Sequence, residues 1–398
     1  MRSLNSSCSG VRSKEIGMIF YCIFWYKKLH EKSLRAGILG AKTDKNGKFY
    51  IVPEVSPFTE MAMNEVFLKE EKVKDALRTL MQKYIVVCPV GGTYSVLTED
   101  LLAKVDIERR GCPPPKLLFL PPKEKMFEYV LRDGVEVKAF LEELEGVLFL
   151  GLRACDLKAL EVLDKVLLEE PADTYYKAKR ERVAIISLDC AEPSDSCFCV
   201  ALGLKPYAEG GFDLNMSRVS GGYVLEAGSD RGKELLTLIK EFTEDASSSQ
   251  LEERQKKREE VAKRLEEKYV IKSVAEIKES VNSLEDEYFE GLAEKCVECF
   301  GCIYSCPTCY CFYVFEESED ETWRRVRIWD PCLSEAFQRV AAGVNPRAKL
   351  AERLKQRFFH KLVYFVERYG EVACVGCGRC VDACLARIDI REVIGVMK

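Results

Sequence analysis

Cysteine is the residue whose number and spacing point most directly to chemistry in this chain. The chain has 398 residues and 19 cysteines, and most of the cysteines lie between Cys296 and Cys384. Two runs there share one spacing: Cys296-x2-Cys299-x2-Cys302-x3-Cys306 and Cys374-x2-Cys377-x2-Cys380-x3-Cys384. This spacing wraps three thiolates of one tight loop around a [4Fe–4S] cluster, while the fourth cysteine reaches the other cluster. The pattern therefore predicts two clusters that are held crosswise.

The crosswise rule assigns each cysteine to one cluster. We expect cluster 1 to be held by Cys296, Cys299, Cys302 and Cys384, and cluster 2 by Cys306, Cys374, Cys377 and Cys380. The neighbouring Gly301, Gly376 and Gly378 let the backbone curl and direct N–H groups toward sulfur. Leu385 stands where a proline usually follows the last cysteine, but proline is not a ligand. Structural zinc is the alternative, because paired Cys motifs also bind zinc.

A third cluster is predicted in the N-terminal half. Cys155 follows the apolar run 147–150, and Cys190 follows the apolar run 183–188. If these runs are parallel strands, both thiols emerge at the carboxyl edge of the sheet, where open α/β sheets place their ligands. Cys197 and Cys199 lie in the loop just beyond. Four thiols could thus close another [4Fe–4S] site, but spacing alone leaves open that they are separate free cysteines.

The other cysteines receive structural interpretations. Cys309, Cys311 and Cys332 surround Cys306, and because they are three rather than four we expect packing or supporting roles instead of ligation. Cys8, Cys22, Cys88 and Cys112 are isolated in the sequence.

The elements that position these cysteines follow from hydrophobic patterning. The pattern predicts an amphipathic helix over 64–83, strands at 84–87 and 93–97, and a strand–helix–strand unit over 147–150, 157–168 and 183–188. A hairpin is expected to end at 223–226, and the charged stretch 251–268 is expected to be a solvated helix. The fold class is α+β. We expect a poorly ordered extension over 1–60, an α/β domain over 61–245, a charged helical linker over 246–290 and a two-cluster ferredoxin-like domain with an insertion over 291–398.

Composition excludes several classes of protein. The net charge of −5 gives no electrostatic reason to expect a nucleic acid as a partner. The apolar run 18–26 is too short to span a membrane, and no start resembles a secretory signal, so we expect a cytoplasmic protein. The two histidines exclude a multi-histidine metal site. Scarce Gln and Asn beside abundant charge hint at a thermophilic source.

No organic-cofactor motif accompanies the cysteines. No GxGxxG follows a strand, and the segment 228–233 falls short of a phosphate-binding loop. His360 is interpreted as a helix residue, and the basic residues Arg324, Arg325 and Arg327 as a counterweight to cluster charge. Electron-handling groups without a substrate site of their own indicate a relay.

The sequence resembles the family that comprises sulfhydrogenase beta subunits and the corresponding iron–sulfur subunit of anaerobic sulfite reductase. The resemblance runs in order from about residue 84 to 398. It rests on the segments 120–125, 151–156, 197–199, 211–214, 306–309, 327–332, 357–361 and 374–380. It strengthens the third cluster, because Cys155, Cys190, Cys197 and Cys199 match a recurring set in the family.

The resemblance implies an iron–sulfur electron-transfer subunit of a larger oxidoreductase. Its partners would be a flavin- and NAD(P)H-binding subunit on one side and a nickel–iron hydrogenase or sulfite reductase subunit on the other. Two alternatives remain: a catalytic subunit that reduces sulfur or polysulfide near Cys155, and a scaffold held together by zinc.

Overall fold

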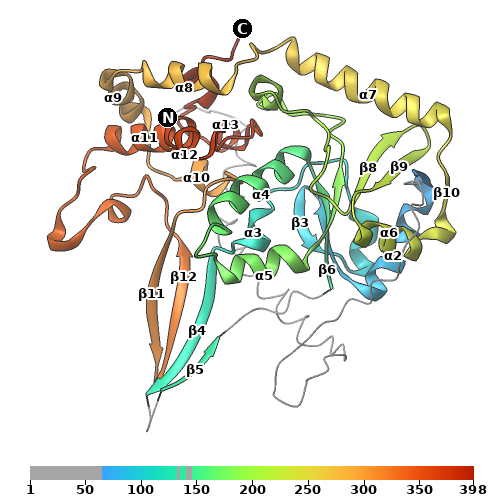
Figure 1. Ribbon diagram of the computed structural model, residues 1–398, viewed down its shortest axis with the longest axis horizontal. Coiled ribbons are helices and arrows are strands. Elements are labelled where there is room, and N and C mark those ends of the chain that lie inside the picture. Colours follow the sequence, from blue (N-terminus) through green and yellow to red (C-terminus); the bar gives the residue numbers. More distant parts are fainter. Residues whose placement is uncertain (1–64, 132–134, 140–145) are drawn as a thin grey trace, which may run out of the picture.

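The structure is a computed structural model that describes residues 65–131, 135–139 and 146–398. The expected extension over 1–60 lies outside the described residues, as do Cys8 and Cys22. Figure 1 shows a sheet with helices on one side of the molecule, a group of helices on the other, and a narrow arm of strands that projects between them. The fold class is α+β, as the sequence predicts.

The larger of the two sheets in the described residues has eight strands. Their spatial order is β10 (Thr243–Asp245), β1 (Val66–Lys69), β9 (Gly222–Ala227), β8 (Leu214–Val219), β7 (Ala184–Leu188), β6 (Val147–Leu152), β2 (Ile85–Val90) and β3 (Thr93–Val96). The central strands β2, β6, β7 and β8 are parallel, and the outer strands pair antiparallel. The predicted strand–helix–strand unit and the hairpin of β8 and β9 are confirmed.

Helices cover both faces of this sheet, so its central strands are apolar throughout. All residues of β6 and β7 are buried. Leu148 faces the side covered by α2 (Val73–Lys83) and α6 (Asp230–Leu238). The adjacent Phe149 faces the side covered by α3 (Lys116–Phe119), α4 (Ala154–Leu167) and α5 (Thr174–Arg182). Continuous apolar runs are the expected pattern for parallel strands buried on both faces.

The predicted helix over 64–83 is wrong in its first part. Residues Val66–Lys69 form strand β1, which pairs with β9 and β10, and the helix α2 begins only at Val73. Phe67 and Leu68 are both buried, on opposite faces of the sheet. Tertiary pairing therefore decides the structure of a segment whose apolar residues also fit a helix.

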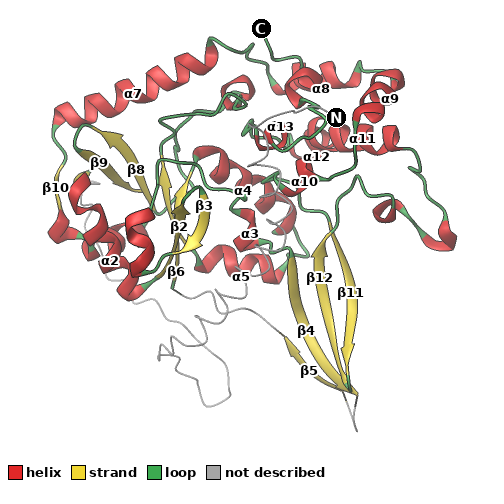
Figure 2. Ribbon diagram, turned by 180° about the vertical axis from the view of Figure 1, so that it is seen from behind, coloured by secondary structure: helices red, strands yellow, loops and turns green. Residues whose placement is uncertain are grey.

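The projecting arm is a second sheet built from two distant parts of the chain (Figure 2). Its order is β11 (Phe312–Glu319), β12 (Thr322–Trp329), β4 (Lys123–Leu131) and β5 (Val135–Ala139). The pairing of β12 with β4 joins the C-terminal insertion to a segment that the sequence assigns to the α/β domain. Their association was not predicted.

A buried ionic cluster anchors the arm. Glu124 is 1% exposed and contacts both Lys179 of α5 and Arg327 of β12, while Arg327 also contacts Asp173. Arg324 pairs with Glu319 and Glu128, and Arg325 pairs with Glu316. The prediction that Arg324, Arg325 and Arg327 offset cluster charge is therefore wrong, because carboxylates of the arm and its base already pair with them.

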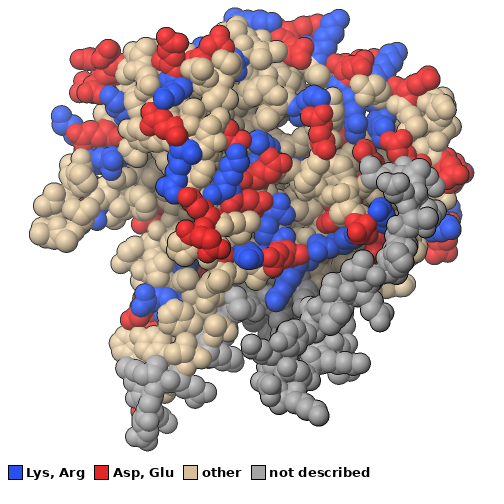
Figure 3. Space-filling view, in the orientation of Figure 1, with Lys and Arg blue, Asp and Glu red and all other residues tan. Residues whose placement is uncertain are grey.

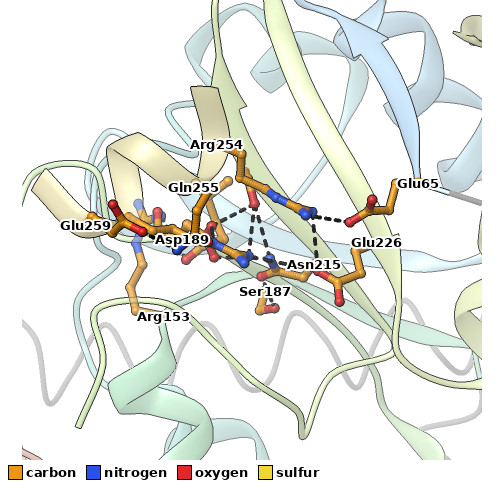
Figure 4. Close-up of polar contacts among 12 residues, drawn as sticks. Glu65, Arg153, Ser187, Asp189, Asn215, Glu226, Arg254, Gln255 and Glu259 are labelled. Carbon is orange, nitrogen blue, oxygen red and sulfur yellow. Dashed lines mark hydrogen bonds and ion pairs between the residues drawn. The ribbon is translucent and has the colours of Figure 1, made fainter. Parts of the chain in front are cut away.

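The charged helix is docked rather than free in solvent. Helix α7 (Ser248–Glu266) begins with a capping box at Ser247 and packs on β8 and β9. Figure 4 shows Arg254 reaching Glu65 and Glu226, at 2.5 and 3.6 Å. The nearby Arg258 donates to Asp189 at 2.7 Å. Over the face shown in Figure 3, basic and acidic side chains are interspersed.

The C-terminal part is built from short helices around one apolar core. The helices are α8 (Val274–Asn282), α9 (Asp286–Lys295), α10 (Gly301–Tyr304), α11 (Leu350–Phe359), α12 (Phe365–Tyr369), α13 (Arg379–Asp382) and α14 (Ile390–Ile394). The loop 197–201 of the first half is buried in this core, so the two halves share a hydrophobic interior. No helix among the described residues is long and apolar enough to cross a membrane.

Glu124→Gln is expected to destabilise the fold by about 3–5 kcal/mol, because it removes the buried negative charge that pairs with Lys179 and Arg327. The measurement is the free energy of unfolding in urea under anaerobic conditions. Glu316→Gln is the matched control, since it removes one partner of a more exposed pair in the same sheet and should cost at most about 1 kcal/mol. Equal losses would contradict the anchoring role of Glu124.

His360 gives the fold a pH dependence. Burial and the neighbouring Lys361 lower the pKa of His360 to about 4, and its ring Nε2 contacts the Tyr310 hydroxyl at 3.1 Å. As the pH falls below 6.5, His360 of the unfolded chain becomes protonated, whereas His360 of the folded chain stays neutral until about pH 4. The free energy of unfolding therefore decreases as the pH drops through this window. We expect the loss between pH 7 and 5 to be at most about 2 kcal/mol. His360→Gln should reduce this loss in urea unfolding, and an unchanged slope would contradict the assignment.

Candidate metal centres

The four cysteines predicted for cluster 1 line one pocket of the C-terminal part. Cys296 directly follows α9, Cys299 and Cys302 flank the start of α10, and Cys384 follows α13. The apolar side chains of Phe358 and Ile390 line the same pocket. The last cysteine of the second run therefore lies with three cysteines of the first run, which is the crosswise arrangement.

The four cysteines predicted for cluster 2 also lie together. Burial raises the pKa of Cys374 to about 11, and the sulfur atoms of Cys306 and Cys377 are close enough to act on that pKa. Burial likewise raises the pKa of Cys380, with contributions from the other three thiols. Two contacts tie the runs together here: Ser305 Oγ donates to the carbonyl of Arg379 at 3.3 Å, and Thr308 Oγ1 donates to that of Ala373 at 2.8 Å.

The four cysteines proposed as a third site line a cavity of about 540 Å³ at the edge of the large sheet. Cys155 lies in the first turn of α4, just after β6, and Cys190 follows β7. Strands β6 and β7 are parallel, so the expected shared edge is confirmed. Cys197 and Cys199 come from the loop beyond, and burial raises the pKa of Cys199 to about 12 and that of Cys190 to about 11.

The middle set of thiols adjoins each of the other two sets. Cys380 belongs to the middle set and also lines the pocket of the first set. Cys377 belongs to the middle set and also lines the cavity of the third. The middle set is therefore adjacent to both of the others.

Two glycines allow the middle and third sets to approach so closely. A Cβ on Gly376 would lie 2.5 Å from the Cα of Cys199, and one on Gly378 would lie 2.4 Å from the Oγ of Ser196. Both glycines also have positive φ, at +60° and +72°. The amide of Phe198 donates to the carbonyl of Gly376 at 2.7 Å. Any larger residue here would push the two loops apart.

Buried arginines lie between the sets. Burial opposes the charge of Arg357, yet the sulfur atoms of Cys302 and Cys380 raise its pKa above the ordinary value. Arg379 is held in the same way between Asp156 and Cys377, and its Nη1 donates to Asp156 at 2.7 Å. The Nε atoms of Arg357 and Arg379 are buried without a hydrogen-bond partner. Arg110 contacts the carbonyl of Cys377 and lies 3.5 Å from the sulfur of Cys197.

These features fit iron–sulfur clusters. Thiolate is the ligand that iron–sulfur clusters require, and each set brings together four cysteines that can supply it. Metal binding would displace the protons that burial keeps on thiols such as those of Cys374 and Cys199. The buried cations between the sets would then face negatively charged groups. Among the described residues, no group of three or more His, Cys, Asp and Glu side chains is arranged to hold a single metal ion.

These cations were not predicted from the sequence, and neither were two buried lysines. Lys361 donates to Thr308 Oγ1 and to the carbonyl of Ala373, both at 2.7 Å, and Lys116 donates to the carbonyl of Cys309 at the same distance. The sequence positions of some of these arginines and lysines could have indicated them. Arg379 lies inside the second cysteine run, and Arg357 and Lys361 are four residues apart, on one face of a helix.

Comparison with known proteins finds similarity in the C-terminal cysteine-rich part and in much of the rest of the chain. Residues 295–388 match the family described as a 4Fe-4S dicluster domain. The chain is also 31% identical over 287 residues to sulfhydrogenase 2 subunit beta of Pyrococcus furiosus. The aligned residues make up 71% of this chain and 81% of that protein. The chain belongs to the sulfhydrogenase beta-subunit family. As a member of this family with a dicluster domain, it is an iron–sulfur electron-transfer subunit that carries [4Fe–4S] clusters. These matches argue against the alternative of a scaffold held by zinc.

Arg357→Gln is expected to lower the reduction potential of clusters beside it, because a nearby cation stabilises the more negative reduced form. The effect should be on the order of 60 mV, which for one electron corresponds to about 1.4 kcal/mol. The measurement is a redox titration followed by electron paramagnetic resonance (EPR). Lys355→Gln is the control on the same helix, because Lys355 pairs with Asp286 near the surface. An unchanged potential in Arg357→Gln would contradict the placement of this cation.

Proposed function

We propose that this chain holds three [4Fe–4S] clusters in a row and conducts electrons between two other subunits. Cluster 1 is assigned to Cys296, Cys299, Cys302 and Cys384, cluster 2 to Cys306, Cys374, Cys377 and Cys380, and cluster 3 to Cys155, Cys190, Cys197 and Cys199. The observation that carries the proposal is that the middle set contributes one lining cysteine to each neighbouring pocket.

The two ends of the row both reach the surface. At the cluster 1 end, Cys299 is exposed, and the apolar side chains of Val297 and Leu385 are 63% and 50% exposed. Both residues lie next to cysteines of the first set in the sequence. At the other end, the cavity around Cys155 and Cys190 is open and is lined by charges of both signs, among them Arg109 and Glu192. An apolar end and a polar end favour two different docking partners.

The protein's own groups tune and shield the metal sites. A bound [4Fe–4S] cluster accepts and releases one electron at a potential set by its environment. Phe358 and Leu354 exclude water from the first pocket, and Val375 is buried beside the middle set. Arg357 and Arg379 place fixed positive charge on either side of the middle set, which favours uptake of an electron there.

The partners follow from the family. The relative's name describes a subunit of a sulfhydrogenase, so we propose a nickel–iron hydrogenase subunit at one end and a flavin- and NAD(P)H-binding subunit at the other. A sulfite reductase subunit in place of the hydrogenase is the alternative that the family resemblance leaves open.

Iron counting on anaerobically prepared protein tests the ligand assignment. In the unaltered chain we expect the iron content of three [4Fe–4S] clusters. Cys302→Ser, Cys380→Ser and Cys197→Ser should each lose about one cluster's share, because each removes a thiolate from a different set.

Cys112→Ser is the control, since Cys112 is an exposed cysteine outside all three sets. It should keep its full iron content. If Cys197→Ser also kept all its iron, the third cluster would be removed from the proposal and the row would end at the second.

A further inference from the structure

A buried polar network lies at the end of strand β7, directly before Cys190. Asp189 follows the strand, and its side chain is 11% exposed. Its Oδ1 accepts a hydrogen bond from Asn215 Nδ2 at 3.1 Å, and its Oδ2 accepts one from Ser217 Oγ at 2.7 Å. Ser187 Oγ in turn donates to Asn215 Oδ1 at 2.7 Å. Side chains of β7 and β8 thus fix the Asp189 carboxylate from the side of the sheet (Figure 4).

Helix α7 completes the network from outside the sheet. Arg258 Nε donates to Asp189 Oδ2 at 2.7 Å, and Arg258 Nη2 donates to Ser217 Oγ at 3.3 Å. The Arg258 side chain is also only 11% exposed, and its guanidinium lies 4.7 Å from the centre of the Tyr207 ring. A buried ion pair adds little net stability compared with apolar residues of the same size, so its presence here points to a positional role.

The contacts of Arg258 reach the chain on both sides of the Cys190 backbone. The Cys190 amide donates to the carbonyl of Pro206 at 2.9 Å, and the next residue is Tyr207, on whose ring Arg258 lies. Arg258 therefore contacts both the residue before Cys190 and the loop that accepts the Cys190 amide. This arrangement restricts the backbone from which the Cys190 thiol projects.

Two further arginines bind the same segment by its carbonyl groups. Arg153 is 3% exposed and donates through Nη1 to the carbonyl of Asp189 at 3.0 Å. Arg264 of α7 donates through Nη2 to the carbonyl of Ala191 at 3.0 Å. The carbonyl groups directly before and directly after Cys190 are thus each bound by an arginine, while Cys190 itself lines the cavity of the third set.

Asp189 and Arg258 can act on the third set only through Cys190 and its neighbours. Cys190, Pro206 and Arg153 are among the described residues that line the cavity, whereas Asp189 and Arg258 are not. Neither residue of the ion pair is therefore placed to touch a cluster in that cavity.

We propose that Asp189 and Arg258 are positioning residues for the third cluster: their ion pair fixes Cys190 in the geometry that a [4Fe–4S] cluster needs. The inference rests on the proposed third cluster and deepens it. Groups that orient metal ligands commonly contribute about 10- to 100-fold to metal affinity. Loss of the ion pair should therefore weaken this cluster and leave the other two unchanged.

The test replaces Arg258 with methionine in the full-length protein, prepared anaerobically with its iron bound. Methionine keeps an apolar stem beside Tyr207 but removes both hydrogen-bond donors. With a ferrous chelator in excess, we expect Arg258→Met to release the iron of one cluster at least about tenfold faster than the unaltered chain. The EPR line shape of cluster 3 should also change, which a role in docking α7 alone would not produce.

Arg254→Met is the matched control, because Arg254 lies one turn earlier on the same helix and pairs with Glu65 and Glu226 instead. It should lower the free energy of unfolding to a similar extent but leave iron release and the EPR line shape unchanged. Ser217→Ala is a milder second variant, which should change both readouts in the same direction as Arg258→Met. Unchanged readouts in Arg258→Met and Ser217→Ala, or equal changes in Arg254→Met, would overturn the proposal.

Cys197→Ser separates this failure from a failure of the proposed function. If Cys197→Ser loses the iron of one cluster, adding Arg258→Met to it should not change the release of the remaining iron. Faster release from those two clusters would overturn the specific role at Cys190. If Cys197→Ser keeps all its iron, the third cluster itself is defeated, whatever Arg258→Met does.

Discussion

The backbone contact between the loop 196–199 and the loop 374–378 is the constraint on which the rest of the site depends. One loop extends from the edge of a mixed sheet, and the other belongs to a ferredoxin-like cysteine run. Gly376 and Gly378 let the two backbones meet at distances that no side chain would permit. Because the loop 197–201 is also part of the C-terminal hydrophobic core, this contact brings thiols from both halves of the chain into one region. Without it, the third set of thiols would be separate from the other two.

Buried positive charge is the second organising feature. An arginine or lysine in an apolar interior is costly unless a negative group lies beside it. Arg357, Arg379 and Lys361 are almost fully buried among thiols, and two of them carry an unpartnered Nε. Asp156 already pairs with Arg379, and anionic clusters would supply the counter-charge of Arg357 and Lys361. The same residues would then contribute both to the stability of the loaded protein and to the potentials of its clusters.

Much of the site could be predicted from the sequence, because covalent spacing determines it. The two cysteine runs indicated the crosswise sets, and the apolar runs before Cys155 and Cys190 indicated the shared sheet edge. Features that depend on distant pairing could not be predicted in this way. The pairing of β4 with β12, the partners of Arg327 and the strand at Val66–Lys69 all depend on segments far apart in the chain.

The most direct test of the three-cluster row is an anomalous-scattering map at the iron edge from crystals grown without oxygen. We expect three separate iron peaks in a row, with the middle one enclosed by Cys306, Cys374, Cys377 and Cys380. A map with zinc instead of iron, or with the middle site empty while the outer two are filled, would contradict it.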